Sequence, residues 1–153
     1  MKVIFLDVDG VLNEMYSKSR APSGTIGVDD DKVERLGEIV DVTKAVVVLS
    51  STWQKEWRAD GVRKDGVYLQ EKLAKRGIHI VGMTGKFGLD RGQGIFEWLQ
   101  DDVTSWIVID DEIFPDYPRY GIMPRLVHTS FLMGGLQDRH VKQAIALLNE
   151  VDK

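Results

Sequence analysis

Short apolar runs alternate along the chain with stretches in which apolar residues recur every three or four positions. The runs are rich in β-branched residues and predict buried strands at residues 2–8, 45–49, 78–81, 106–109 and 125–128. The periodic stretches predict helices that start near residue 29, span residues 67–76 and 93–99, and start near residue 137. Segment 53–66 fits neither pattern and has no assigned structure.

The order of these elements predicts an α/β fold with a doubly wound, Rossmann-like and mostly parallel sheet. Parallel strands need long crossover connections, and helices must cover both faces of a sheet whose strands are apolar throughout. With 153 residues and no repeat or linker, the chain is expected to form a single domain over residues 1–153. There is no room for a large cap domain between residues 13 and 28 or between residues 53 and 85.

Polar side chains follow three of the predicted strands at the point where each strand ends. Ligands of such sheets bind outside the carboxyl ends of the strands, so these three groups are expected to share one edge. They are Asp7 and Asp9, Ser50 and Ser51, and Asp110 and Asp111.

Composition restricts the metals and partners that this edge can take. The chain has no cysteine, so a thiolate metal site and a cysteine nucleophile are excluded. The three histidines, at positions 79, 128 and 140, have no ligand spacing and are expected to be structural. A net charge of -4 argues against a stable complex with nucleic acid held by bulk electrostatics. No apolar run is long enough to span a membrane or to act as a signal peptide, so a cytoplasmic protein is expected.

Clustered carboxylates without histidine or cysteine favour a hard cation, and Mg²⁺ fits best. A carboxylate nucleophile can divide phosphate ester hydrolysis into formation and breakdown of an aspartyl phosphate. A second carboxyl group can protonate the leaving oxygen and then activate water. Asp7 and Asp9 are the candidates for this pair.

The segment Asp7-Val8-Asp9-Gly10-Val11-Leu12 after an apolar strand resembles the first motif of the haloacid dehalogenase-like (HAD) phosphatase superfamily. Ser50 matches the second motif of that family, Arg91 its basic third motif, and Asp110-Asp111 its acidic fourth motif. The four motifs come in family order. The pattern Arg91-Gly92-Gln93-Gly94-Ile95 with Trp98-Leu99 is similar, more loosely, to the HAD branch associated with nucleic-acid end repair.

The resemblance implies a role for each matched residue. Asp7 would be the nucleophile and a metal ligand, and Asp9 the general acid and base whose backbone carbonyl also binds metal. Ser50 would donate a hydrogen bond to the phosphoryl group, and Arg91 would stabilise its charge. Of Asp110 and Asp111, both expected at the metal, the second aligns better with the principal ligand of the family.

Further residues are expected at the substrate: Val8 and Gly10 in the first loop, Ser51 beside Ser50, and Lys86. Lys86 is an alternative to Arg91, because the family more often has lysine there, although Arg91 has the better position before the helix. The expected substrate is a phosphorylated small molecule or nucleic-acid end. Capless relatives often accept large substrates, or take cover from a partner subunit.

Other interpretations stand beside these. Trp53 and Trp57 fit core packing better than stacking on a base, and Trp98 and Trp106 fit the core. Arg63, Lys64, Arg119 and Arg125 fit solvated loops better than a grip on a polyanion. A phosphate-binding or regulatory module without turnover is the rival function. A receiver-like signalling domain ranks lower, because both leading carboxylates here come from the first strand.

Overall fold

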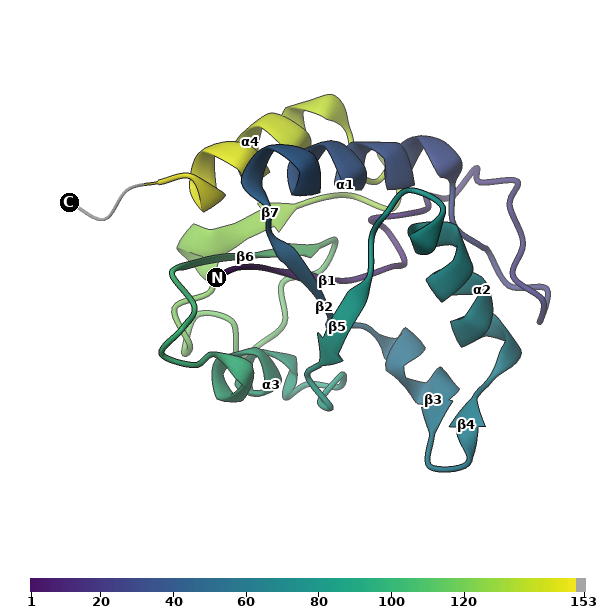
Figure 1. Ribbon diagram of the computed structural model, residues 1–153, viewed down its shortest axis with the longest axis horizontal. Coiled ribbons are helices and arrows are strands. Elements are labelled where there is room, and N and C mark those ends of the chain that lie inside the picture. Colours follow the sequence, from purple (N-terminus) through teal and green to yellow (C-terminus); the bar gives the residue numbers. More distant parts are fainter. Residues whose placement is uncertain (151–153) are drawn as a thin grey trace.

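The computed structural model describes residues 1–150, which fold around one five-stranded sheet (Figure 1). All neighbouring strands of this sheet are parallel, in the order β5-β2-β1-β6-β7. The strands are β1 (Lys2–Leu6), β2 (Val46–Leu49), β5 (Ile80–Met83), β6 (Ser105–Asp110) and β7 (Leu126–His128). The predicted doubly wound sheet is confirmed, with the first strand in its centre.

Four helices cover the two faces of the sheet. They are α1 (Asp30–Thr43), α2 (Lys64–Ala74), α3 (Arg91–Trp98) and α4 (Asp138–Leu148). In Figure 1, α1 and α4 lie side by side over one face and α3 lies on the other. Each parallel connection needs such a crossover, which explains why helices and strands alternate along the chain.

Alternate residues of each central strand enter two separate apolar cores. In β1, Ile4 and Leu6 belong to the core under α1, α2 and α4, whereas Val3 and Phe5 belong to the core under α3. Successive side chains of a strand point to opposite faces, so a strand buried on both faces must be apolar throughout. Trp98 and Trp106 pack edge-on against Phe5, with ring centroids 5.7 and 6.2 Å away, as expected for core residues.

Segment 53–66, which the sequence left unassigned, forms part of a short 3₁₀ helix and a small hairpin. The 3₁₀ helix η1 spans Thr52–Glu56, and the hairpin pairs β3 (Trp57–Arg58) with β4 (Gly61–Val62). A second 3₁₀ helix, η2 (Met123–Arg125), precedes β7. The hairpin projects from the body of the protein beside α2 (Figure 1). Strands this short carry no periodic pattern that a sequence can display.

Several predicted boundaries differ from the structure by two or three residues. The first strand ends at Leu6 rather than at residue 8, because Val8 already accepts the turn hydrogen bonds from Val11 and Leu12. The predicted strand 78–81 lies at 80–83, and the helix expected from residue 67 begins at Lys64. Polar residues occur both at helix ends and in loops, so the sequence pattern predicts the elements better than it predicts their boundaries.

No separate cap domain is formed by residues 1–150, as expected. Residues 13–28 form a loop that side-chain hydrogen bonds hold near its start and at its middle. Ser17 and Ser19 hydroxyls donate to the Asp29 carboxylate at 2.5 and 2.7 Å, and the Ser23 hydroxyl donates to Asp65 at 2.6 Å. Among residues 1–150, no helix combines the length and the apolar character that crossing a membrane requires.

Candidate active site

The carboxyl ends of three neighbouring strands bring the predicted site residues together. The Asp7 N–H donates to the Ile109 carbonyl at 3.0 Å, and the Ser50 N–H donates to the Leu6 carbonyl at 2.8 Å. These bonds continue the parallel ladder just past the ends of β1 and β2. The side chains that follow the strands are therefore fixed by the sheet rather than by free loops.

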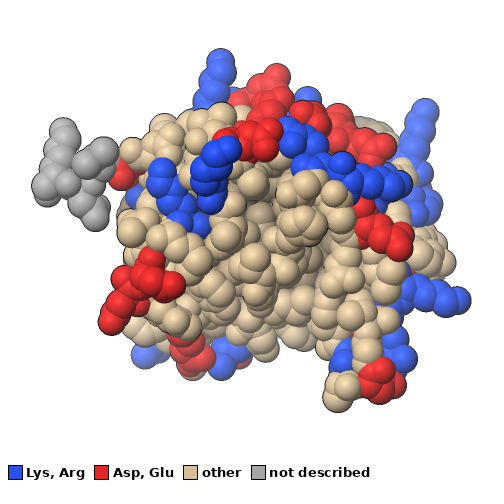
Figure 2. All heavy atoms as spheres, viewed as in Figure 1, with Lys and Arg blue, Asp and Glu red and all other residues tan. Residues whose placement is uncertain are grey.

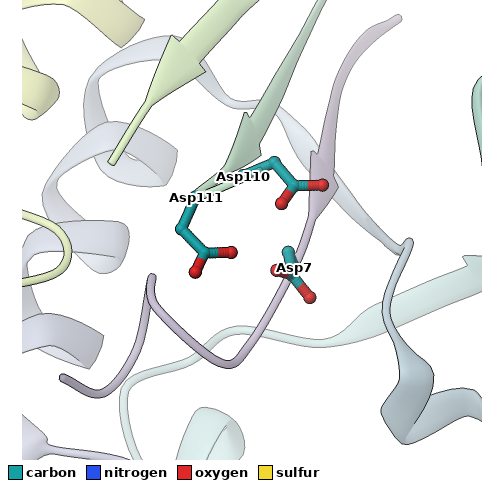
Figure 3. Close-up of side chains that lie close together, drawn as sticks. All are labelled: Asp7, Asp110 and Asp111. Atoms are coloured by element: carbon teal, nitrogen blue, oxygen red, sulfur yellow. The ribbon is translucent and has the colours of Figure 1, made fainter. Parts of the chain in front are cut away.

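Asp7, Asp110 and Asp111 point toward one another in a compact group (Figure 3). Their nearest carboxylate oxygens all lie within 4.8 Å of one another. Asp7 and Asp110 are buried, and Asp111 is partly exposed. Three carboxylates from two strands thus meet at one point, two of them shielded from water.

The carboxylate of Asp110 is fixed by neighbouring donors on both oxygens. Oδ1 accepts from the Glu112 N–H at 3.0 Å, and Oδ2 accepts from the Tyr117 hydroxyl at 2.7 Å. Arg91 Nη1 donates to the same Oδ2 at 3.2 Å. Asp110 is therefore held as a rigid support, and Asp111 has more freedom to engage a ligand.

Arg91, the first residue of α3, is the cation of the site. Its Nη1 lies 3.4 Å from Asp7 Oδ1 and 3.2 Å from Asp110 Oδ2. The guanidinium lies over the Phe114 ring, with Cζ 4.0 Å from the centroid. Although burial lowers its pKa, the charges of Asp7 and Asp110 raise it above the ordinary value overall, so the group stays charged.

Charge repulsion remains in the carboxylate group despite Arg91. Burial, and then the charge of Asp110, raise the pKa of Asp7 well above 3.8. Burial also raises the pKa of Asp111 to about 6. A hydrogen bond with Asp7 lowers this pKa, and the charge of Asp110 raises it. One guanidinium does not neutralise three carboxylates at this spacing. The group is therefore short of positive charge.

A divalent cation fits this donor set. Oxygen-only ligands around an acidic, partly open site suit Mg²⁺, which binds through few carboxylates and keeps several waters. The missing positive charge in the group of Asp7, Asp110 and Asp111 is the structural observation that supports the fit. The Asp9 carboxylate is not part of this group, so any contact from Asp9 to metal would be through its backbone, as the motif resemblance implies.

Asp9 is not part of the group of three carboxylates, and two donors orient its side chain. Asn13 Nδ2 donates to Oδ1 at 2.9 Å, and the Trp53 indole Nε1–H donates to Oδ2 at 3.2 Å. Asn13 is itself fixed, because its Nδ2 also donates to the Gly27 carbonyl and its Oδ1 accepts from the Gly10 N–H. The carboxyl group of Asp9 thus has a set position beside Asp7 but outside the acidic group.

The two serines after β2 have different environments. The Ser51 hydroxyl accepts from the Trp53 N–H at 3.2 Å and caps η1. Helix capping is a common structural role of serine. The Ser50 hydroxyl is buried and has no hydrogen-bond partner among residues 1–150. A buried hydroxyl without a partner is costly unless a ligand supplies one. Ser50 therefore fits the predicted phosphoryl contact better than Ser51 does.

Gly10 allows the first loop to pass close to Asp111. Its φ is +82°, a left-handed conformation, and a Cβ atom at this position would collide with the Asp111 carboxylate. Its N–H is already taken by Asn13, and the side chain of Val8 is buried in the core. Contacts of Val8 and Gly10 with substrate stay predictions.

Of the two predicted basic residues, the structure brings only Arg91 to the carboxylates. The Lys86 ammonium lies on the surface, 2.9 Å from Glu97. A cleft of about 270 Å³ opens over the site and is lined by Asp7, Asp9 and Arg91 among others, but not by Lys86. Arg91 is therefore the better candidate for the phosphoryl-stabilising cation.

Several site residues were missed by the sequence because their contacts depend on the folded chain. Asn13 and Trp53 hold Asp9, and Tyr117 and Phe114 contact Asp110 and Arg91. Trp53 is mostly buried, as expected, but its indole also serves the site. Only its place just after the serine pair offered a signal.

His140, which was expected to be structural, is so, whereas Arg125, which was expected to be a solvated loop residue, is partly buried and bonded to the backbone. His140 Nδ1 accepts from the Gln137 N–H at the start of α4. Arg125 binds the Trp106 and Leu147 carbonyls, at the edge of the sheet opposite the site. Figure 2 shows Lys, Arg, Asp and Glu interleaved around the margin of one face, without a large patch of one sign.

The parallel sheet carries a buried aspartate after its first strand, a hydroxyl after the second, a buried cation at a helix start and an acidic pair at the end of β6. This is the arrangement of a HAD-type domain. A family model described as the HAD domain in Swiss Army Knife RNA repair proteins matches residues 3–141. The chain belongs to that family. No curated protein and no solved structure matches it.

Proposed function

We propose that the protein is a Mg²⁺-dependent phosphomonoesterase that acts on phosphorylated RNA ends through an aspartyl phosphate on Asp7. The main support for this proposal is the group of Asp7, Asp110 and Asp111. Arg91 Nη1 lies 3.4 Å from Asp7 Oδ1, and Asp9 is held just outside the group. The RNA substrate is proposed from the family, whose description concerns RNA repair.

Asp7, Asp111 and the backbone of Asp9 are the proposed metal ligands, with Asp110 in support. When bound, Mg²⁺ neutralises charge on the carboxylates and the phosphoryl oxygens and keeps Asp7 ionised. The Arg91 guanidinium and the Ser50 hydroxyl would donate to the remaining phosphoryl oxygens, where charge develops.

In the first step, an Asp7 carboxylate oxygen attacks phosphorus, and the bond between phosphorus and the ester oxygen breaks. Asp9 gives its proton to the leaving oxygen, so the product is an alcohol rather than an alkoxide. In the second step, the Asp9 carboxylate removes a proton from water as the water oxygen attacks phosphorus. The bond to Asp7 breaks, inorganic phosphate leaves, and both carboxyl groups return to their starting state.

The fixed position of Asp9 suits this double role. Asn13 and Trp53 each donate to one of its oxygens, so the carboxyl group keeps one orientation while its proton leaves and returns. Orientation of a proton donor contributes to catalysis because proton transfer requires hydrogen-bond distance in the transition state.

The test measures phosphate release from 3′- and 5′-phosphorylated oligoribonucleotides, with Mg²⁺ and after chelation by EDTA. We expect release that requires Mg²⁺ and that is lost in Asp7→Asn, which removes the nucleophile without changing its volume. Asp31→Asn, an exposed aspartate of α1, is the matched control and should keep full activity. Release that survives rigorous chelation, or an active Asp7→Asn variant, would contradict the proposal.

A further inference from the structure

A second, larger pocket adjoins the catalytic cleft. It has a volume of about 620 Å³, and its lining shares Asp9, Thr52 and Asp111 with the cleft over Asp7. Asp9, the proposed proton donor to the leaving oxygen, lies in the wall between the two. A leaving group bonded to a phosphoryl group at Asp7 would therefore extend into the larger pocket.

The walls of this pocket are fixed before any ligand binds. Asp65, at the start of α2, accepts from the Ser23 N–H at 3.0 Å and from its hydroxyl at 2.6 Å, which ties the 13–28 loop to the helix. On the other side, the Trp53 ring is fixed by its bond to Asp9. A preformed pocket loses little entropy on binding, which favours selective recognition.

The lining combines apolar surface with polar groups in the manner of a ligand site. Phe131 and Ile26 supply aromatic and apolar surface, with a small part of the mostly buried Trp53, and aromatic rings bind nucleobases by stacking. Glu56, at the end of η1, lines the same pocket and makes no side-chain hydrogen bond or ion pair within residues 1–150. Its carboxylate is thus available as a hydrogen-bond acceptor.

The charge of the pocket restricts the leaving group that it can hold. Among the described residues that line only this pocket and not the cleft, Lys55 is the one basic residue, whereas Glu56 and Asp65 are both acidic. A second phosphate group in the pocket would meet two anions and one cation. An uncharged group with hydroxyl donors fits better, because a carboxylate accepts hydrogen bonds but cannot donate them when ionised.

We propose that this pocket binds the terminal ribonucleoside of the substrate, with the base against Phe131 and a ribose hydroxyl donating to Glu56. The inference rests on the proposed phosphatase function and adds to it a preference for ribose over deoxyribose. The 2′-hydroxyl is the group by which a protein distinguishes RNA from DNA at a given position.

The test compares kcat/KM for 3′- and 5′-phosphorylated ribotrinucleotides with the 2′-deoxy forms, and uses acetyl phosphate as a reference. Acetate, the leaving group of that reference, has neither a ring nor a hydroxyl group. We expect the ribonucleotides to be favoured by about tenfold, the size of one hydrogen bond to a charged group. Glu56→Ala should remove this preference and change acetyl phosphate hydrolysis by less than about twofold.

Glu71→Ala, an exposed glutamate of α2, is the matched control and should leave kcat/KM unchanged for every one of these substrates. Equal hydrolysis of ribo and deoxy substrates by the wild type would overturn the inference and leave the phosphatase standing. Hydrolysis retained by Asp7→Asn would instead contradict the proposed mechanism.

A direct binding measurement keeps the inference testable if no ester is turned over. Tryptophan fluorescence is followed as the wild type is titrated with the ribotrinucleotide that lacks a terminal phosphate. Saturable quenching, weaker in Glu56→Ala and with the deoxy form, supports the pocket. Identical curves for the ribo and deoxy forms would reject it.

Discussion

At the scale of single residues, the site depends on hydrogen bonds that give each carboxyl group different neighbours. Asp110 has donors on both oxygens, Asp9 has Asn13 and Trp53, and Asp7 has a raised pKa in a buried position. Carboxyl groups of one site take different roles when their surroundings differ. These contacts lead to two predictions.

Trp53→Phe keeps an aromatic ring but removes the N–H that holds Asp9. We expect kcat/KM, which reports transfer of the phosphoryl group to Asp7 and not its later hydrolysis, to fall about tenfold for an alkyl phosphate, the equivalent of one hydrogen bond. The loss should be much smaller for acetyl phosphate, whose leaving group needs little protonation. The ratio of the two rates, measured by steady-state kinetics, reports on the proton donor rather than on folding.

Trp57→Phe is the control, since Trp57 packs against the core in β3. It should lower both rates little and leave their ratio unchanged. Equal losses for both substrates in Trp53→Phe would show that Trp53 supports only the fold.

Tyr117→Phe removes the hydroxyl that donates to Asp110 at 2.7 Å. Tyr117 is fully buried, and burial, then the charge of Asp110, raise its pKa, so it keeps its proton as a donor at neutral pH. Loss of a donor to a buried carboxylate should lower the free energy of unfolding by about 1 to 3 kcal/mol. Urea denaturation measures this change.

Tyr120→Phe is the matched control, because Tyr120 stacks on Phe96 in a partly exposed position. A change within about 0.5 kcal/mol is expected there. If both variants lost the same stability, the bond from Tyr117 to Asp110 would have no special weight.

The residue types at the site could be predicted from the sequence, whereas the bonds that orient them could not. Asp7, Asp110, Asp111, Ser50 and Arg91 come at strand ends or a helix start, where topology alone brings them together. Asn13, Trp53, Tyr117 and Phe114 reach the site through loops whose path no periodic pattern specifies. The motif resemblance assigned the phosphoryl contact to Ser50 with Ser51 beside it, and the structure adds that Ser51 caps η1.

At the scale of elements, the start of α3 positions Arg91. Asp116 accepts from the N–H groups of Gly92 and Gln93, both at 2.9 Å, and so satisfies two of the free donors at the helix start. A carboxylate at the N-terminal end of a helix also interacts favourably with the helix dipole. The loop after β6 therefore fixes the helix that presents the cation of the site.

Asp116→Ala should lower the free energy of unfolding by about 0.5 to 2 kcal/mol, the usual effect of losing a helix cap. It should also lower kcat, because Arg91 is the first residue of the helix. Asp90→Ala is the control, since Asp90 occupies the N-cap position without a side-chain capping bond. Thermal denaturation and kinetics of both variants provide the measurement, and equal behaviour would contradict the role of Asp116.

The elements themselves were largely predictable, because strands buried on both faces leave long apolar runs and crossover helices leave a period of three to four. The hairpin of β3 and β4 was not, since two-residue strands have no pattern. The cap of α3 comes from Asp116, more than twenty residues from the helix donors in sequence. Such long-range caps have no local signature.

At the scale of the whole molecule, the group of three carboxylates connects stability to pH. The folded-state pKa of Asp111 is about 6 against an ordinary value of 3.8, and that of Asp7 is also raised. Between these values the folded protein binds more protons than the unfolded chain. The stability of the metal-free protein should therefore fall as pH rises from about 4 through 6.

Mg²⁺ should reverse this trend, because it binds the ionised carboxylates of the folded protein. We expect Mg²⁺ to raise the melting temperature more at pH 8 than at pH 5, compared with EDTA at each pH. Asp111→Asn should reduce the difference. An equal effect of Mg²⁺ at both pH values would argue against a metal bound to these carboxylates.

The central claim is that Asp7 carries the phosphoryl group during turnover. The most direct measurement is mass spectrometry of the Asp9→Asn variant after mixing with acetyl phosphate and Mg²⁺, followed by acid quenching, because acetate leaves without the proton that Asp9 gives to an alkyl oxygen. Without the proton acceptor, breakdown of the intermediate is slowed. The account predicts a phosphoryl group on the peptide that contains Asp7, absent from the Asp7→Asn control. A phosphoryl group on Asp110 or Asp111, or phosphate release without any phosphorylated peptide, would contradict it.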